Sequence, residues 1–300
     1  MFMKRSFETK CLIIMIVLSI SAILLLALVS LLAEERISVA VWSRVSDLGT
    51  ETFYIAAGLA IYYMISPSIG FFTIFSLVLS GSLNSFLKDL LAMPRPSNPK
   101  IPVEGYGFPS GHAQNTTVFW EVFTLLTRSS CVTVLSILLI SIVSYSRIYL
   151  NVHFVHDVVG GVVIGLLLSL ALYLFHRRVV NVFYRDLVIV ATSITATLLV
   201  FAYNHDVTVL KLSGVSLGAL IHVMLLSKRN YSLPTPNISR RIVSYLVAMI
   251  VILAILYATR GVASTSLIAT YIVYVFIGSL IPVLYVFLIK SLAQRSLARY

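Results

Sequence analysis

Charged residues are scarce in this chain, and their scarcity excludes a soluble globular protein. Asp, Glu, Lys and Arg make up 11% of the 300 residues, against about 25% in soluble domains. Cysteine is rarer still. Only Cys11 and Cys131 are present, each at the start of an apolar run, which excludes a secreted scaffold built on disulfides. What is abundant is apolar: 59% of the residues, with a mean hydropathy of +0.99. This composition is typical of a membrane protein.

Apolar runs of membrane-spanning character recur along the whole chain. A helix needs about 20 apolar residues to cross a hydrocarbon core of roughly 30 Å. The first run is too long for a signal peptide and predicts a retained anchor. The second, fourth and fifth runs (52–65, 113–126 and 131–145) are short, so the helices that contain them must extend into neighbouring polar residues. The ten runs are 11–33, 52–65, 69–87, 113–126, 131–145, 158–175, 187–203, 207–226, 242–259 and 266–289. We therefore predict an all-α, polytopic transmembrane helical bundle of about ten spans.

The basic residues sort by side of the predicted membrane. With ten spans both termini share one side, and that side receives 14 of the 22 Lys and Arg residues. Because cytoplasmic loops carry the excess of Lys and Arg, both termini are predicted to be cytoplasmic, in a multi-pass protein of the cell membrane. The formal net charge of +11 thus follows from membrane sidedness and does not indicate a nucleic-acid partner.

One extracytoplasmic loop is unusual, and three polar motifs gather around it. Residues 88–112 contain five of the nine prolines. Motif 1, K-x6-R-P, runs from Lys88 through Arg95 to Pro96. Motif 2, P-S-G-H, ends at His112. Motif 3, S-R-x5-H-x3-D, contains Arg147, His153 and Asp157. Long irregular loops in compact folds tend to carry function, and the topology allows the three motifs to meet at one outer patch.

The residue types in this patch favour phosphoryl chemistry. Lys88, Arg95 and Arg147 are three cations close to hydrocarbon, an arrangement that is costly unless an anion completes it. Forked guanidinium donors and an ammonium match a phosphate group. Ser110 and Gly111 open a helix, whose free N–H groups attract anions.

Two histidines add the groups that phosphoryl transfer requires. His153 and Asp157 are four residues apart, so the carboxylate can fix the imidazole tautomer and leave the other ring nitrogen free to attack. His112 can protonate a departing oxygen. Together with the cations, these residues predict transfer of a phosphoryl group through a phosphohistidine.

These motifs, in this order and spacing, resemble the three signatures of the type 2 phosphatidic-acid phosphatase superfamily, which is related to the vanadium haloperoxidases. The resemblance covers residues 1–176 or so and departs at no signature position. It implies that His153 is the nucleophile, Asp157 its orienting partner and His112 the general acid and then base. It also implies catalysis without a metal or other cofactor. The implied phosphate-binding residues are Lys88, Arg95, Ser110, Gly111 and Arg147.

Three other interpretations stay open on the sequence alone. His153, His156 and Asp157 have a spacing that could serve zinc, although His156 is not part of motif 3. A phosphotransferase would pass the group from the same phosphohistidine to an alcohol. Ten spans alone would suit a transporter, but transporters usually bind substrate near mid-bilayer, whereas these ionisable residues gather at one edge.

The sequence thus predicts a six-span membrane phosphatase core in residues 1–180 and a four-span extension of unknown role in residues 181–300. The expected substrate is a lipid phosphate or diphosphate held at the extracytoplasmic interface. An isoprenoid (dolichyl or undecaprenyl) diphosphate comes first, ahead of phosphatidate, phosphatidylglycerophosphate or a sphingoid-base phosphate. No residue reads the lipid tail, and the oligomeric state is not indicated. Two glycine pairs, Gly161/Gly165 and Gly214/Gly218, predict close helix packing within the chain.

Overall fold

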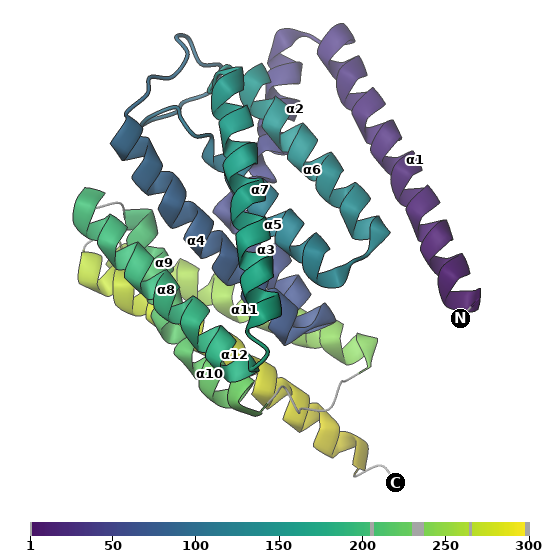
Figure 1. Cartoon of the computed structure of the whole chain (residues 1–300), viewed down its shortest axis with the longest axis vertical. Helices are drawn as coiled ribbons and strands as arrows, with labels where there is room; N and C mark the ends of the chain where they lie inside the picture. The colour runs from purple at the N-terminus through teal and green to yellow at the C-terminus, as the bar shows by residue number, and fades with distance from the viewer. Residues whose placement is uncertain (1, 205–206, 230–236, 264–265, 298–300) are drawn as a thin grey trace. The chain divides into compact units, whose positions relative to one another are not determined.

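The structure is a computed structural model that describes residues 2–204, 207–229, 237–263 and 266–297 (Figure 1). All secondary-structure elements in these residues are helical, and residues 92–110 form an irregular loop. All ten predicted apolar runs lie in helices. The helices are α1 (Phe2–Leu32), α2 (Glu35–Asp47), α3 (Glu51–Ala60), a π-helix (Ile61–Ile65), α4 (Pro67–Leu91), α5 (Gly111–Thr127), α6 (Ser130–Tyr149), α7 (Val155–Arg178), α8 (Val182–Asn204), α9 (Val207–Gly218), α10 (Leu220–Leu225), a 3₁₀ turn (Ser227–Arg229), α11 (Ile238–Ala263) and α12 (Leu267–Leu297).

The prediction of a polytopic helical bundle is confirmed. In the described part of the chain, eight helical segments are long and apolar enough to cross a membrane. A ninth span forms if α2 and the segment Glu51–Ile65, which meet at a 47° bend, act as one. The remaining predicted run is α5, which has 17 residues and a length of about 26 Å at 1.5 Å per residue. Its first turn is polar and carries Gly111 and His112 of motif 2.

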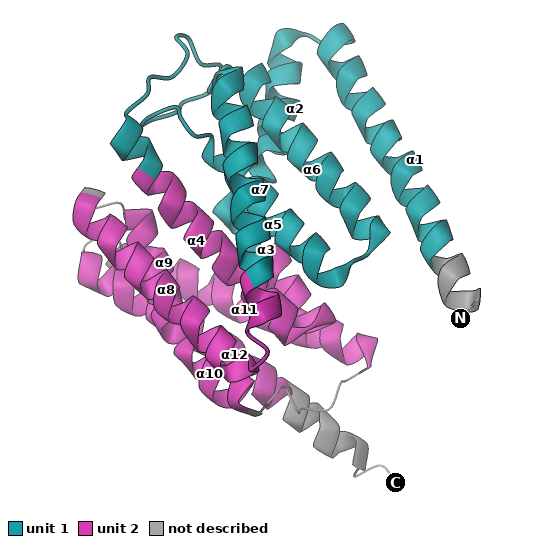
Figure 2. Cartoon of the chain, viewed as in Figure 1, with its two compact units in different colours: residues 1–54, 87–174 teal, residues 55–86, 175–300 magenta. Residues whose placement is uncertain are grey.

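The chain divides into two compact units (Figure 2). The first comprises residues 1–54 and 87–174, and the second comprises residues 55–86 and 175–300. All eight predicted site residues lie in the first unit. The predicted division into a core of residues 1–180 and an extension of residues 181–300 remains a prediction.

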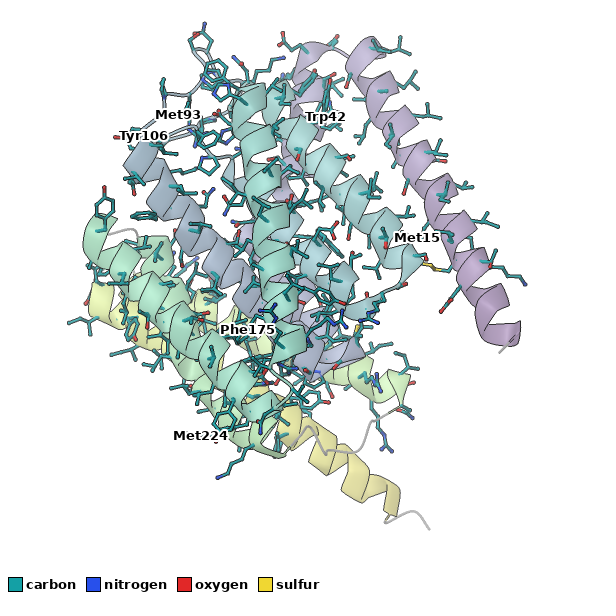
Figure 3. All side chains as sticks on the ribbon, in the orientation of Figure 1. Met15, Trp42, Met93, Tyr106, Phe175 and Met224 are labelled. Carbon is teal, nitrogen blue, oxygen red and sulfur yellow. A yellow bond between two sulfur atoms is a disulfide. The ribbon has the colours of Figure 1, made fainter. Side chains whose placement is uncertain are left out.

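In the first unit, α6 is the central helix. It packs against α5, α1 and α2. A disulfide joins Cys11 of α1 to Cys131 of α6, with their Cα atoms 6.2 Å apart (Figure 3). This pairing was not predicted, because two cysteines 120 residues apart form no local pattern.

A small apolar cluster holds the proline-rich loop in place. Trp42 of α2 packs with Leu150 and Val152, which follow α6, and the loop residues Ile101 and Val103 cover them. Backbone bonds add to this, since Lys100 N–H donates to the Leu150 carbonyl at 2.9 Å. The loop is therefore anchored against the end of α6, where motif 3 begins.

The second unit is held by helix packing and a buried polar network. α9 packs against α8 and α12. A Cβ on Gly214 would lie 2.8 Å from the Tyr271 carbonyl oxygen, and one on Gly218 would lie 2.1 Å from that of Val275, so the packing predicted for this glycine pair is confirmed. Asp186 accepts from Arg185 Nε at 2.9 Å and from Ser227 Oγ at 2.6 Å. This unit contains none of the predicted site residues.

Candidate active site

The three motifs meet at one end of the first unit. Lys88 lies in the last turn of α4, and Arg95 lies in the loop that follows it. His112 is in the first turn of α5, and Arg147 is in the last turn of α6. Motifs 2 and 3 are joined directly, because Ser110 N–H donates to the Asp157 carbonyl at 3.0 Å. The charges of the three cations act on both His112 and His153. We call Lys88, Arg95, His112, Arg147, His153 and Asp157 the site cluster.

Local sequence explains why these segments stop and turn where they do. Pro94, Pro96, Pro99, Pro102 and Pro109 cannot donate a backbone hydrogen bond, so α4 does not continue into the loop. After α6, Asn151 adopts a left-handed conformation (φ 52°), which asparagine tolerates well. Its side-chain amide donates to the carbonyls of Ser97 and Asn98 at 2.8 and 3.1 Å. This asparagine thereby fixes the loop beside motif 3.

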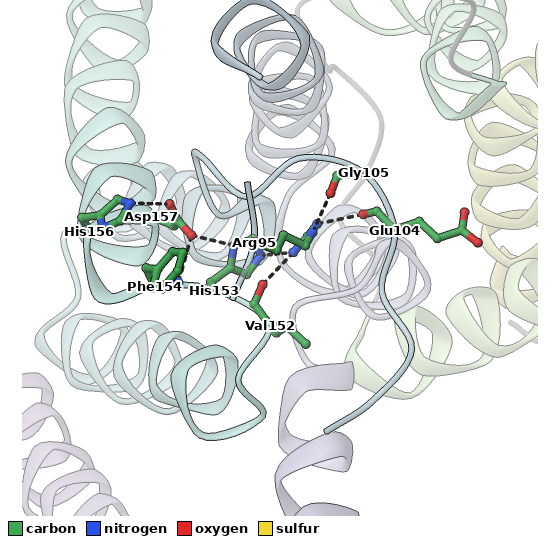
Figure 4. Close-up of polar contacts among 8 residues, drawn as sticks. All are labelled: Arg95, Glu104, Gly105, Val152, His153, Phe154, His156 and Asp157. Carbon is green, nitrogen blue, oxygen red and sulfur yellow. Dashed lines mark hydrogen bonds and ion pairs between the residues drawn. The ribbon is translucent and has the colours of Figure 1, made fainter. Parts of the chain in front are cut away.

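His153 and Asp157 form the predicted pair (Figure 4). His153 Nδ1 lies 3.5 Å from Asp157 Oδ2, and both side chains are buried. The same carboxylate oxygen accepts the Phe154 N–H at 2.9 Å. Because Nδ1 faces an acceptor, we assign the ring proton to Nδ1, which leaves the lone pair on Nε2. Nε2 points away from Asp157, toward Arg95.

Arg95 connects the loop to His153 (Figure 4). Its Nε and one terminal nitrogen donate to the Gly105 and Glu104 carbonyls, at 2.9 and 3.0 Å. The other terminal nitrogen lies 2.8 Å from the Val152 carbonyl and 3.1 Å from His153 Nε2. Four of the five N–H groups of this guanidinium thus contact the protein itself. Attack by Nε2 requires this contact to give way.

Several buried polar atoms at the site have no hydrogen-bond partner. Ser110 Oγ and Arg147 Nε are such atoms, and both residues are at least nine-tenths buried. Buried donors without partners cost about 1–3 kcal/mol each. Phosphate oxygens placed between motifs 2 and 3 would satisfy both.

The electrostatic environment keeps both imidazoles neutral. His112 and His153 both lie outside the ten predicted apolar runs. Burial lowers the pKa of His153 to about 2, with further lowering by the charges of Arg95, Arg147 and Lys88. Burial likewise lowers the pKa of His112 to about 3, helped by the same three cations. Neutral His153 suits a nucleophile. His112 needs a proton to act as an acid, and a bound dianion would offset the cations and raise its pKa.

These lowered pKa values predict acid-sensitive stability. The folded chain leaves both imidazoles neutral well below pH 6.5, whereas the unfolded chain protonates them there. Stability should therefore fall as the pH drops below 6.5, by about 2 kcal/mol per histidine at pH 5. Thermal unfolding in detergent between pH 7.5 and 5 measures this loss. The double variant His112→Gln/His153→Gln should show a flatter dependence. Equal slopes for the two proteins would contradict the prediction.

Close packing of α7 on motif 2 confirms the internal role of the first glycine pair. A Cβ on Gly161 would lie 2.6 Å from the Ser110 carbonyl oxygen, and one on Gly165 would lie 2.9 Å from that of Gln114. Both contacts are to backbone, which cannot rotate aside. Motifs 2 and 3 are thus held together by helices that touch at glycine.

Gly161→Ala should consequently destabilise the protein. Overpacking of a tight contact costs about 1–3 kcal/mol, which a lower melting temperature in detergent would reveal. Gly261→Ala is the matched control, because a Cβ there meets nothing within 4 Å. Similar melting temperatures for the two variants would contradict the packing argument.

His156, the histidine that motif 3 does not require, lies on the other side of Asp157 (Figure 4). Its Nε2 is 3.1 Å from Asp157 Oδ1, and its side chain is 57% exposed. The ring stacks beside Phe154, with centroids 5.3 Å apart. Within the described residues, no three His, Cys, Asp or Glu side chains are grouped so that they could hold a metal ion.

Comparisons with known proteins agree with the motifs. Residues 70–181 match the model of the PAP2 superfamily. The chain is 35% identical over 94 residues to lipid A 4′-phosphatase of Bacteroides thetaiotaomicron, covering 27% of this chain and 42% of that protein. It is 33% identical over 140 residues to human sphingosine-1-phosphate phosphatase 2, covering 42% and 35%. It is 32% identical over 128 residues to undecaprenyl-diphosphatase of Sulfolobus acidocaldarius, covering 40% and 62%.

Each alignment spans less than two thirds of the relative's own length. The family match, by contrast, contains all three motifs, from Lys88 to Asp157. Residues 70–181 of this multi-pass membrane chain therefore belong to the PAP2 superfamily, the type 2 phosphatidic acid phosphatases.

Proposed function

We propose that this chain is an integral membrane lipid phosphatase that removes phosphate from a lipid phosphate or diphosphate through a phosphohistidine. One observation carries the proposal. His153 Nε2 faces the Arg95 guanidinium while its Nδ1 faces Asp157, and the charges of Arg147 and Lys88 also act on this imidazole. The three cations and one carboxylate of the site cluster leave two positive charges in excess, and a phosphate monoester dianion has two negative charges. A reactive imidazole in such surroundings suits phosphoryl transfer.

The proposed reaction has two steps. His153 Nε2 attacks the terminal phosphorus, and the bond from that phosphorus to the leaving oxygen breaks as the N–P bond forms. The leaving oxygen is the bridging oxygen of a lipid diphosphate or the lipid oxygen of a lipid monophosphate. His112 donates a proton to the departing oxygen. His112 then takes a proton from water, whose oxygen attacks phosphorus and breaks the N–P bond, releasing inorganic phosphate. Lys88, Arg95, Arg147 and the N-terminus of α5 at Ser110–Gly111 would neutralise the phosphoryl oxygens throughout, and no metal is required.

An amphiphilic substrate is supported by apolar side chains on the motif-bearing segments. Phe154 follows the proposed nucleophile directly and is 42% exposed, and Val155 beside it is 59% exposed. Leu90 and Leu91 in motif 1 and Tyr106 in the loop are also exposed. A site for a water-soluble substrate would not need exposed apolar side chains around it. It suits a lipid whose phosphate enters the cluster while its tail remains in the bilayer.

The names of the three relatives refer to lipid A, sphingosine 1-phosphate and undecaprenyl diphosphate. Among these chemistries our first choice is an isoprenoid diphosphate, because the excess of Lys and Arg on the terminal side favours an extracytoplasmic site. Such a site suits removal of phosphate from a lipid carrier after its cargo has left on that side. Phosphatidate, phosphatidylglycerophosphate and sphingoid-base phosphates follow.

The test is release of inorganic phosphate from a panel of these lipids by purified protein in EDTA. Undecaprenyl diphosphate should be hydrolysed most rapidly by the wild type, and not by His153→Ala or His112→Ala. Loss of activity in EDTA would overturn the metal-independent mechanism. Transfer of the group to an added lipid alcohol without phosphate release would instead indicate a phosphotransferase.

A further inference from the structure

The turn between α2 and α3 reaches the site cluster although it belongs to none of the three motifs. It comprises residues 48–50, Ser46 lies just before it in the last turn of α2, and both belong to the first unit. Its own backbone is well tied, since Gly49 N–H donates to the Ser46 carbonyl at 2.9 Å and Thr50 Oγ1 donates to that of Asp47 at 2.6 Å. A turn fixed in this way can hold other side chains in place.

Ser46 contacts Arg147. A terminal nitrogen of the Arg147 guanidinium donates to Ser46 Oγ, and both residues are buried, at 3% and 6% exposure. The Nε of the same guanidinium has no partner. Ser46 thus accepts a hydrogen bond from a terminal nitrogen of the guanidinium, and the Nε–H group remains for a ligand. Without Ser46, the long arginine side chain would lose a buried hydrogen bond that fixes its direction.

Gly49 contacts His112. A Cβ at this position would lie 2.8 Å from His112 Cδ2 and 2.8 Å from Val143 Cγ1. The imidazole edge therefore rests on glycine backbone, and any larger residue would push the ring. The backbone of His112 is held by a second chain of contacts nearby, in which Tyr54 OH and Thr116 Oγ1 lie 2.6 Å apart and Thr116 donates to the His112 carbonyl at 2.6 Å.

We propose that Ser46 and Gly49 are positioning residues of the phosphate site, Ser46 by directing the Arg147 guanidinium and Gly49 by fixing the ring of His112. The proposal rests on the proposed function. The two contacts act on different groups: Arg147 would bind phosphate, whereas His112 would move protons. Their loss should therefore have different kinetic signatures.

The experiment compares variants by phosphate binding and by turnover. Ser46→Ala should weaken binding of inorganic phosphate, measured by its protection against thermal unfolding, about tenfold, and raise KM similarly. Ser46→Thr, which keeps the hydroxyl, should restore both. Gly49→Ala should lower kcat about 10- to 100-fold while phosphate binding changes little.

Ser38→Ala is the matched control. Ser38 is also buried in α2, but it donates to the Val29 carbonyl of α1 at 3.0 Å and lies in no motif. If Ser38→Ala weakens phosphate binding as much as Ser46→Ala does, packing of α2 is responsible and the inference fails. If the wild type releases phosphate from lipids and Ser46→Ala binds and turns over normally, the inference fails while the proposed function stands. If the wild type binds inorganic phosphate through Ser46 and hydrolyses no lipid, the function fails instead.

Discussion

His153→Ala is expected to abolish release of inorganic phosphate from lipid phosphates, with a fall in kcat of about 10⁴-fold or more. The reason is chemical, because Nε2 of this buried imidazole lies 3.1 Å from the Arg95 guanidinium while Nδ1 faces Asp157, so Nε2 is the nitrogen placed to attack a bound phosphate. The measurement is phosphate release, together with labelling of the protein by a radioactive phosphate on the lipid. Wild type should carry acid-labile label, and the variant should carry none.

His156→Ala is the matched control for this experiment. It removes an imidazole three residues away, on the opposite oxygen of the same carboxylate, and one that is largely exposed. We expect its activity to remain within about threefold of wild type. Label that survives in His153→Ala would refute the phosphohistidine assignment, whatever its rate.

Substitution of Asp157 is expected to have the second largest effect, and its size should depend on the replacement. Asp157→Ala removes the acceptor that orients the His153 ring, and we expect kcat to fall about 10³-fold. Asp157→Asn should lose less, about 10- to 100-fold. The reason is that the Phe154 N–H, which donates to Oδ2 at 2.9 Å, would hold the amide oxygen in the same position. The tautomer would then survive, and only the negative charge would be lost.

Phosphate release and melting temperature should be measured for both variants. Glu35→Gln is a suitable control, because this carboxylate is 75% exposed and pairs with Lys100 at 3.0 Å outside the site cluster. An Asp157→Asn variant as inactive as Asp157→Ala would show that charge, and not ring orientation, is the main contribution of Asp157.

The sequence was sufficient to predict the apolar helices and the meeting of the motifs, since both follow from local patterns, but α2 lies outside every predicted run. Apolar runs predict helices, and the four-residue spacing of His153 and Asp157 predicts their contact. The contact of Ser46 with Arg147 was missed because it spans 101 residues. A single serine in a polar helix gives no signal that such a contact exists. The same applies to Gly49, whose role appears only when His112 lies against it.

Arg95 shows a different kind of limit. Motif spacing predicted a phosphate-binding cation, yet the side chain is hydrogen-bonded to the backbone of two segments and to His153. Which acceptor a guanidinium selects depends on the carbonyls that the folded loop presents. No pattern of residue types specifies these.

The glycine contacts between α7 and motif 2 have a consequence for the lipid surroundings. Spans held only by side-chain packing can tilt when bilayer thickness changes. Gly161 and Gly165 instead bring the α7 backbone against the carbonyls of Ser110 and Gln114. Hydrophobic mismatch would then tilt α5 and α7 as a pair, without sliding one along the other. The spacing of the two imidazoles, and hence turnover, should consequently vary little between reconstituted membranes of short and long acyl chains.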